Sequence, residues 1–195
     1  MERELLVTGI GGQGVQLAAQ VVARAALSEG REVQLFGSYG GMMRGGNTDA
    51  TLVVADGPIE APPTVSEAWS AILMHHDYSE STRARLRPGS LVLVNSTVFD
   101  GPLDRDAWQV VEIAATDLAV DTGNVMTASM VMVGAYAAVT GLVGMDALEA
   151  AVRDSLPSYR ARHAELNVRA LHAGAAAAPA TRVAAWDAPV AGASR

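Results

Sequence analysis

Apolar and polar positions follow two spacings along this chain. Short runs of apolar residues are typical of buried strands, and apolar residues that recur every three or four positions are typical of helices. Strands are predicted at residues 4–8, 32–36, 48–55, 69–74, 91–95 and 108–113. Helices are predicted at residues 12–28, 78–86, 116–120, 125–142, 145–156 and 160–173, with the Pro-Gly pair at 88–89 ending the second of these. We therefore expect a three-layer α/β/α, Rossmann-like fold with a largely parallel sheet and a helical C-terminal part, in which strand 48–55 could run antiparallel.

The pattern indicates one domain at residues 1–174 and a flexible Ala/Pro-rich tail at residues 175–195. The most apolar segment, residues 125–143, is interpreted as a buried helix rather than a membrane span, because no basic flank or second span accompanies it. The N-terminus is charged and leads directly into a strand, which is untypical of a signal peptide. We therefore expect a cytoplasmic protein that does not bind membranes.

Composition excludes several kinds of chemistry. The net charge of -7 argues against a nucleic-acid partner, since phosphate contacts need clustered basic residues. All 14 basic residues are Arg, so a lysine-dependent phosphate loop and Schiff-base catalysis are excluded. The chain has no Cys, which excludes disulfides, thiol nucleophiles and Cys-ligated iron–sulfur clusters within it.

A glycine-rich turn joins the first predicted strand to the first predicted helix. Gly9, Gly11 and Gly14 have G-x-G-x-x-G spacing, with Gly12 and Gln13 between them. Such a turn directs backbone N–H groups and the positive end of a helix dipole towards one point, which favours a phosphate, pyrophosphate or carboxylate. A tight turn that only packs the strand against the helix is the alternative. A dinucleotide site is weakened because the strand at 32–36 is not followed by the acidic residue that holds a ribose.

A second glycine-rich stretch occupies residues 37–47. Glycine allows a backbone to approach a ligand or another chain closely, and Arg44 has the geometry to bind a phosphate or carboxylate with two hydrogen bonds. The Tyr and Met side chains of this loop predict a surface that another subunit covers. The candidate binding residues here are Tyr39, Gly40, Arg44, Gly45 and Gly46.

His75, His76 and Asp77 suggest metal or acid–base chemistry. However, adjacent histidines on a strand point to opposite faces, so we interpret this sequence as a capped strand end. We expect this chain to contain no catalytic residue and no metal ligand.

Taken in order, these segments resemble the gamma subunit of the thiamine-diphosphate-dependent 2-oxoacid:acceptor (ferredoxin) oxidoreductases. That group includes the pyruvate, 2-oxoisovalerate, 2-oxoglutarate and indolepyruvate enzymes. The resemblance covers about residues 3–174. Its matching segments are residues 9–15, 38–46, 58–62, 87–89, 95–96, 130–135 and 165–174.

The resemblance implies a subunit of a complex that decarboxylates a 2-oxoacid oxidatively to its acyl-CoA and reduces a ferredoxin. It implies that alpha and beta partner subunits bind thiamine diphosphate with Mg, and that a ferredoxin-type subunit carries iron–sulfur clusters. This chain would pack against them and help to bind coenzyme A, with the catalytic centre in the partner chains. The candidate coenzyme A contacts are Gly9, Gly11, Gly12, Gln13, Gly14, Tyr39, Gly40, Arg44, Gly45 and Gly46.

Two positions depart from the pattern of that family. Met42 stands where an acidic residue is common, and Ser129 stands where Asn is frequent. The substrate therefore stays open. Two other functions also stay open: a free-standing NAD(P)-binding Rossmann oxidoreductase, and a non-catalytic scaffold subunit.

Overall fold

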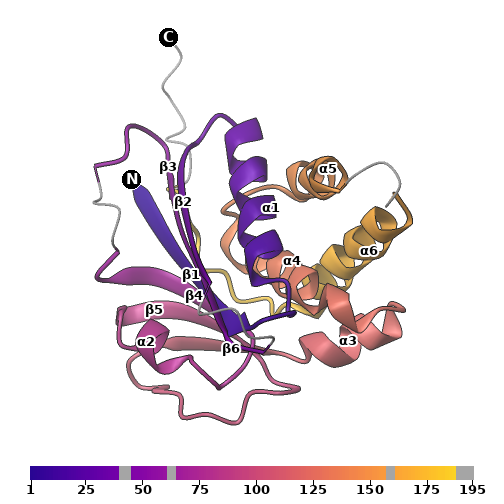
Figure 1. Ribbon diagram of the computed structural model, residues 1–195. Helices are drawn as coiled ribbons and strands as arrows, with labels where there is room; N and C mark the ends of the chain where they lie inside the picture. The colour runs from indigo at the N-terminus through magenta and orange to yellow at the C-terminus, as the bar shows by residue number, and fades with distance from the viewer. Residues whose placement is uncertain (40–44, 61–64, 157–160, 188–195) are drawn as a thin grey trace.

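A single six-stranded sheet forms the centre of the protein in a computed structural model, which describes residues 1–39, 45–60, 65–156 and 161–187 (Figure 1). The strands are β1 (Glu2–Ile10), β2 (Glu32–Tyr39), β3 (Asn47–Ala55), β4 (Ala68–Leu73), β5 (Leu86–Asn95) and β6 (Gln109–Ile113). Their spatial order is β2-β3-β1-β4-β5-β6. The β1–β4, β4–β5 and β5–β6 pairs are parallel, whereas β3 is antiparallel to both of its neighbours. The expected α/β fold with a largely parallel sheet is confirmed.

In a simple strand–helix–strand unit β1 and β2 would be neighbours, but here β3 lies between them. The register pairs Ile10 of β1 with Asn47 of β3, and Tyr39 of β2 with Thr48. The β2–β3 connection therefore begins and ends at the sheet edge where β1 also ends. This pairing brings the start of β3 next to the first glycine turn.

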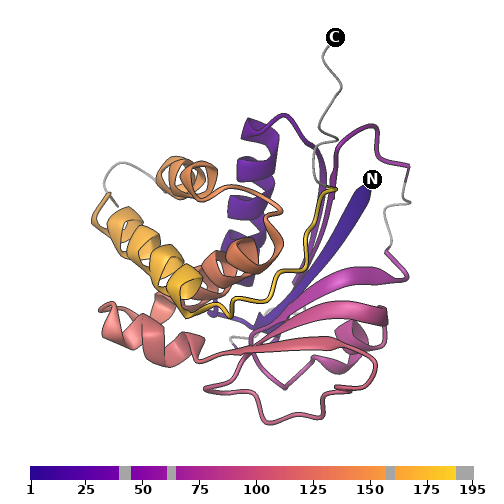
Figure 2. The same ribbon diagram turned by 180° about the vertical axis from the view of Figure 1, so that it is seen from behind.

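Five helices cover one face of the sheet, and the short helix α2 (Glu80–Arg83) lies on the other (Figures 1 and 2). The five are α1 (Val15–Ser28), α3 (Ala115–Asp121), α4 (Ala128–Thr140), α5 (Met145–Ser155) and α6 (Ala161–Ala177). A 3-10 turn, η1 (Val125–Thr127), precedes α4. Almost every residue of α4 is buried, which confirms the buried helix expected from its continuous apolar sequence. Within the described ranges, no helix combines the length and the apolar character that a membrane crossing requires.

Two glycines allow α4 and α6 to touch backbone to backbone. A Cβ on Gly134 would lie 1.9 Å from the carbonyl oxygen of Leu171. A Cβ on Gly174 would lie 1.8 Å from that of Val131. Each helix thus requires a glycine where it meets the other, and this contact fixes the position of α6 beside the sheet edge.

Residues 78–95 differ from the sequence prediction. Helix α2 spans four residues only, and β5 already starts at Leu86. Pro88 and Gly89 therefore lie within the strand, where Gly89 has a positive φ of 84°, instead of ending a helix. Both precede the buried half of the strand and lie at the register shift between the Ala68–Leu86 and Ser70–Leu91 pairs, and proline is tolerated at such irregularities.

The C-terminal segment also differs from the expected flexible tail at residues 175–195. Helix α6 continues to Ala177, and residues 178–187 run back along the molecule (Figure 2). Ala185 is fully buried, and Trp186 donates a hydrogen bond from Nε1 to the carbonyl oxygen of Leu142 at 3.0 Å. The guanidinium of Arg31 lies 4.0 Å from the Trp186 ring centre. These contacts attach residues up to 187 to the domain, while residues 188–195 lie outside the described ranges.

Candidate functional site

The candidate site lies where β1, β4 and β5 end at one edge of the sheet. Ligands of open α/β sheets bind at the carboxyl ends of the strands. Here β1 is followed by the glycine turn, β4 by His75–Asp77, and β5 ends at Asn95. The buried Asn95 side chain joins two of these ends, because its Nδ2 donates to the hydroxyl of Thr116 at 2.9 Å and to the carbonyl oxygen of Met74 at 3.4 Å.

Gln13 holds the first glycine turn in shape. Its Oε1 accepts a hydrogen bond from the backbone N–H of Ile10 at 3.0 Å. The backbone N–H of Gln13 donates to the Ile10 carbonyl oxygen at 3.1 Å. Its Nε2 donates to the carbonyl oxygen of Met74 at 3.4 Å, which ties the turn to the end of β4. A polar side chain inside the turn thus has a structural role that a simple strand–helix turn would not need.

The glycines of this turn allow close packing around it. A Cβ on Gly9 would lie 2.6 Å from Oε1 of Gln13, and a Cβ on Gly14 would lie 2.5 Å from Oγ of Ser129. Gly14 also has a positive φ of 78°. The Ser129 hydroxyl oxygen is buried and makes no hydrogen bond with the described residues. Any larger residue at Gly9 or Gly14 would push apart the elements that meet here.

The turn presents its backbone to solvent at the start of α1. Gly11 and Gly12 are exposed, and Gly12 has a positive φ of 102°. Gly14 is the N-cap of α1, no side chain caps that end, and the first turn contains no acidic residue. The N–H groups of a helix's first turn have no partner within the helix. The arrangement favours an anion, as the sequence predicts.

The two glycine-rich stretches lie against each other. The N–H of Gly11 donates to the carbonyl oxygen of Gly46 at 2.8 Å, and a Cβ on Gly11 would lie 3.3 Å from the backbone nitrogen of Gly45. The structure thus brings together Gly11, Gly45 and Gly46 of the candidate residues. Tyr39 ends β2 opposite Thr48. Gly40 and Arg44 are outside the described residues, so their proposed roles depend on the sequence alone.

A cavity of about 380 Å³ opens beside the turn, on the side of the helices. Sequence reasoning gave none of its helical lining residues a site role. Gly134 and Gly174 set the position of α6, which contributes His163 and Asn167 to the cavity. The sequence shows these glycines, but their effect on the cavity depends on how the helices pack. The lining residues are Gly12, Gly14, Leu17, Asn124, Met126, Thr127, Leu156, His163 and Asn167.

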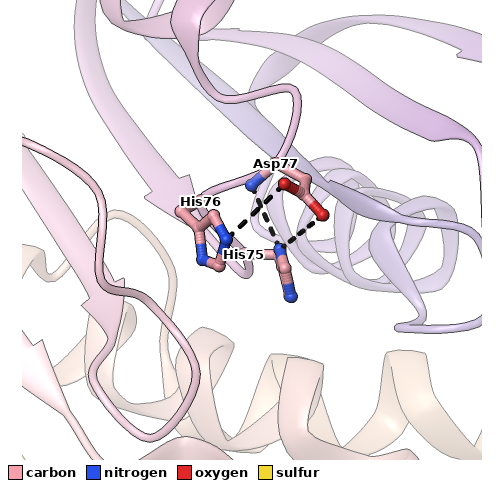
Figure 3. Close-up of side chains that lie close together, drawn as sticks. All are labelled: His75, His76 and Asp77. Carbon is pink, nitrogen blue, oxygen red and sulfur yellow. Dashed lines mark hydrogen bonds and ion pairs between the residues drawn. The ribbon is translucent and has the colours of Figure 1, made fainter.

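The interpretation of His75 and His76 as side chains on opposite faces of a strand is wrong. Strand β4 ends at Leu73, so both histidines lie beyond it. Their ring centres are 4.4 Å apart, and both side chains approach Asp77 (Figure 3). This part of the sheet edge therefore carries a cluster of polar side chains.

A dinucleotide site of the usual kind does not fit this sheet. In such folds the acidic residue that binds the ribose ends the strand next to β1. Here β3 separates β2 from β1, and the end of β2 carries no acidic residue. The chain thus has the glycine turn of dinucleotide-binding proteins without the acidic residue that binds the ribose.

Comparison with known proteins identifies relatives over most of the chain. The family model for pyruvate ferredoxin/flavodoxin oxidoreductase matches residues 4–177. The 2-oxoglutarate synthase subunit KorC of Methanothermobacter thermautotrophicus is 32% identical, over 89% of this chain and 94% of its own length. The pyruvate synthase subunit PorC of Methanocaldococcus jannaschii is 30% identical, over 86% of this chain and 92% of its own length.

Solved structures show the same architecture. The gamma subunit of keto/oxoacid ferredoxin oxidoreductase from Geobacter sulfurreducens matches with a TM-score of 0.77 and 28% identity, over 91% of this chain and 96% of its own. The 2-oxoglutarate:ferredoxin oxidoreductase from Magnetococcus marinus, solved with 2-oxoglutarate, coenzyme A and succinyl-CoA bound, matches with a TM-score of 0.80. At 17% identity, over 93% of this chain and 33% of that one, this second likeness shows the fold alone. The chain belongs to the pyruvate ferredoxin/flavodoxin oxidoreductase family.

Proposed function

We propose that this chain is the gamma subunit of a 2-oxoacid:ferredoxin oxidoreductase complex, which converts a 2-oxoacid and coenzyme A to an acyl-CoA and CO2 while it reduces a ferredoxin. The observation that carries the proposal is the likeness, over most of both chains, to subunits of 2-oxoglutarate synthase and pyruvate synthase. The chemistry of the chain agrees with it, since a protein without Cys or Lys offers neither cluster ligands nor an amine nucleophile. The substrate could be any of several 2-oxoacids.

The two joined glycine stretches are proposed to form one half of a phosphate-binding site for coenzyme A. The backbone N–H groups at the uncapped start of α1 supply hydrogen-bond donors for an anion. Arg44, within the second stretch, would supply a positive charge in a chain whose net charge is -7. Partner subunits would complete the site.

The remaining cofactors are proposed to belong to partner subunits in the cytoplasm. Alpha and beta subunits would hold thiamine diphosphate with Mg, and a ferredoxin-type subunit would hold the iron–sulfur clusters. Exposed apolar side chains support a partner: Val120 of α3 and Val125 and Met126 of η1 are exposed, and Met126 lines the cavity.

Affinity purification of the tagged chain from its native source tests the assembly. The proposal expects stable co-purification of a thiamine-diphosphate-binding subunit and of iron–sulfur protein, together with 2-oxoacid-dependent, coenzyme A-dependent reduction of ferredoxin. Elution of the chain alone, with neither partner nor activity in any fraction, would contradict it.

A further inference from the structure

The cluster of His75, His76 and Asp77 lies at the end of β4, outside the proposed coenzyme A site. Figure 3 shows the three side chains turned towards one another, and one ligand atom from each lies within 4.8 Å of the other two. Tyr78 follows with a positive φ of 62°, which non-glycine residues rarely adopt. This turn reverses the chain directly after Asp77.

The distances within the cluster fit a shared cation better than direct ion pairs. Nδ1 of His75 is 3.6 Å from Oδ2 of Asp77, and Nε2 of His76 is 3.5 Å from Oδ1 of the same carboxylate. Direct charge-assisted hydrogen bonds are shorter, at about 2.7–2.9 Å. In contrast, two ligands of a tetrahedral ion with bonds of about 2.1 Å are separated by about 3.4 Å.

Asp100 determines which nitrogen of His76 carries the hydrogen and which one is available as a metal ligand. Nδ1 of His76 lies 2.8 Å from Oδ1 of Asp100 and 3.2 Å from the carbonyl oxygen of Val98. Both neighbours accept hydrogen bonds, so Nδ1 carries a hydrogen. In the neutral ring, Nε2 then directs its lone pair at the Asp77 carboxylate. That arrangement leaves two electron-pair donors, the ring nitrogen and the carboxylate, facing one another with space for a cation between them.

The surroundings of His75 supply the second nitrogen ligand. Its Nδ1 accepts a hydrogen bond from the backbone N–H of Asp77 at 3.1 Å, so this nitrogen carries a lone pair rather than a hydrogen, and it lies 3.6 Å from Oδ2 of Asp77. Metal binding would replace that hydrogen bond with a coordinate bond. The Asp77 side chain is 59% exposed, which leaves room for water or another ligand at the ion.

We propose that Nδ1 of His75, Nε2 of His76 and the Asp77 carboxylate bind a divalent transition-metal ion of the zinc type, with at least one coordination position open to solvent. Two imidazoles and one carboxylate are a ligand set that such ions use, whereas Mg²⁺ and Ca²⁺ prefer oxygen ligands only. Asp100 is a positioning residue, because a carboxylate that accepts the other ring N–H orients a ligating histidine and strengthens it as a ligand.

Calorimetric titration of the chelator-treated full chain with Zn²⁺ tests the site. Wild type should bind one equivalent. Asp100→Asn should weaken binding about 10–100-fold, and His76→Gln or Asp77→Asn should weaken it further. His172→Gln is the matched control, since it removes an exposed imidazole that contacts only Glu149 among the described residues, and it should leave the affinity unchanged.

Two further measurements keep the result decisive. Co²⁺ bound to wild type should give the strong visible absorption of a four-coordinate ion, and Asp100→Asn should change that spectrum. Zn²⁺ should raise the Tm of wild type and leave the Tm of the double variant His75→Gln/His76→Gln at its own metal-free value. Absence of Zn²⁺ binding by wild type, or equal affinity in wild type and the double variant, would overturn the proposal.

Discussion

At the scale of single residues, Gly14 leaves no room for a side chain, because a Cβ there would lie 2.5 Å from Oγ of Ser129. Spacing alone showed Gly9, Gly11 and Gly14 between a strand and a helix. The need for Gly14 depends on Ser129, which is distant in sequence and was noted only as a departure from the family pattern. Contacts between distant residues leave no periodic signal, so neither that contact nor the cavity lining could be predicted.

Gly14→Ala should destabilise the protein by about 2–4 kcal/mol, because left-handed backbone costs an L-residue about 1–2 kcal/mol and the new methyl would clash with Ser129. Gly12→Ala is the matched control, since its Cβ would meet open space and only the backbone cost applies. Urea unfolding measures both. Replacing Ser129 by Ala in the Gly14→Ala background should recover part of the loss. Equal losses for the two glycine variants would disprove the clash.

At the scale of elements, the hydrophobic pattern located every strand and nearly every helix of the described ranges, but not their pairing. Nothing in the sequence placed β3 between β1 and β2, because pairing depends on contacts between strands rather than on the period within each. The segment after α6 was expected to be flexible because Ala and Pro predominate, yet Ala185 and Trp186 attach it to the helices. A few buried contacts outweigh a low-complexity composition.

The contact between α4 and α6 provides a test at this scale. Gly134→Ala should destabilise the protein by at least about 3 kcal/mol, since a Cβ there meets a backbone carbonyl that cannot move alone. Gly30→Ala, where the Cβ would meet open space, should cost only about 1–2 kcal/mol for its left-handed backbone. Thermal and urea unfolding measure the difference, and similar costs for both variants would show that the helices do not meet as described.

Ion pairs of Glu149, within α5 and with α6, make the free energy of unfolding depend on pH. Glu149 contacts His172 at 2.7 Å and Arg153 at 3.2 Å, and these partners, His172 first, hold the pKa of its carboxyl below the usual value. A carboxyl with a lowered pKa stabilises the fold above its unfolded-state pKa, and this contribution disappears as the pH falls through the folded-state pKa.

Glu149→Gln should therefore reduce stability at pH 7 by less than about 1 kcal/mol, as expected for an exposed pair. The difference from wild type should shrink at about pH 3, below the ordinary pKa of a Glu carboxyl, and vanish once the pH lies below the lowered folded-state pKa. Asp154→Asn is the control, because Asp154 lies on α5 and forms no ion pair with the described residues. Urea unfolding at both pH values measures the effect, and a loss that persists in acid would contradict the role of the charge.

At the scale of the whole molecule, membership of the pyruvate ferredoxin/flavodoxin oxidoreductase family is consistent with a chain whose glycine turn favours an anion and whose relatives act as subunits of larger complexes. The relatives are subunits of pyruvate synthase and 2-oxoglutarate synthase. Val120 of α3 and Val125 and Met126 of η1 are exposed apolar residues, and Met126 lines the cavity at the turn. A partner that covers them would also enclose the proposed phosphate site.

Met126→Glu should therefore weaken assembly of the complex about 10-fold or more, because a buried unpaired charge is costly in an interface. Leu27→Glu is the matched control, since Leu27 is similarly exposed but lies near the far end of α1. Analytical ultracentrifugation of the mixed subunits compares the two, and unchanged assembly of the Met126→Glu variant would exclude this surface as the interface.

Calorimetric titration of coenzyme A into the assembled complex tests the claim that this chain contributes half of a coenzyme A site. Arg44→Ala should weaken binding about 10–100-fold, the loss expected for a charge-assisted contact with phosphate. Arg24→Ala, on an exposed part of α1, should leave the affinity unchanged. The isolated chain should bind coenzyme A far more weakly than the complex. Equal affinity in wild-type and Arg44→Ala complexes would contradict the claim.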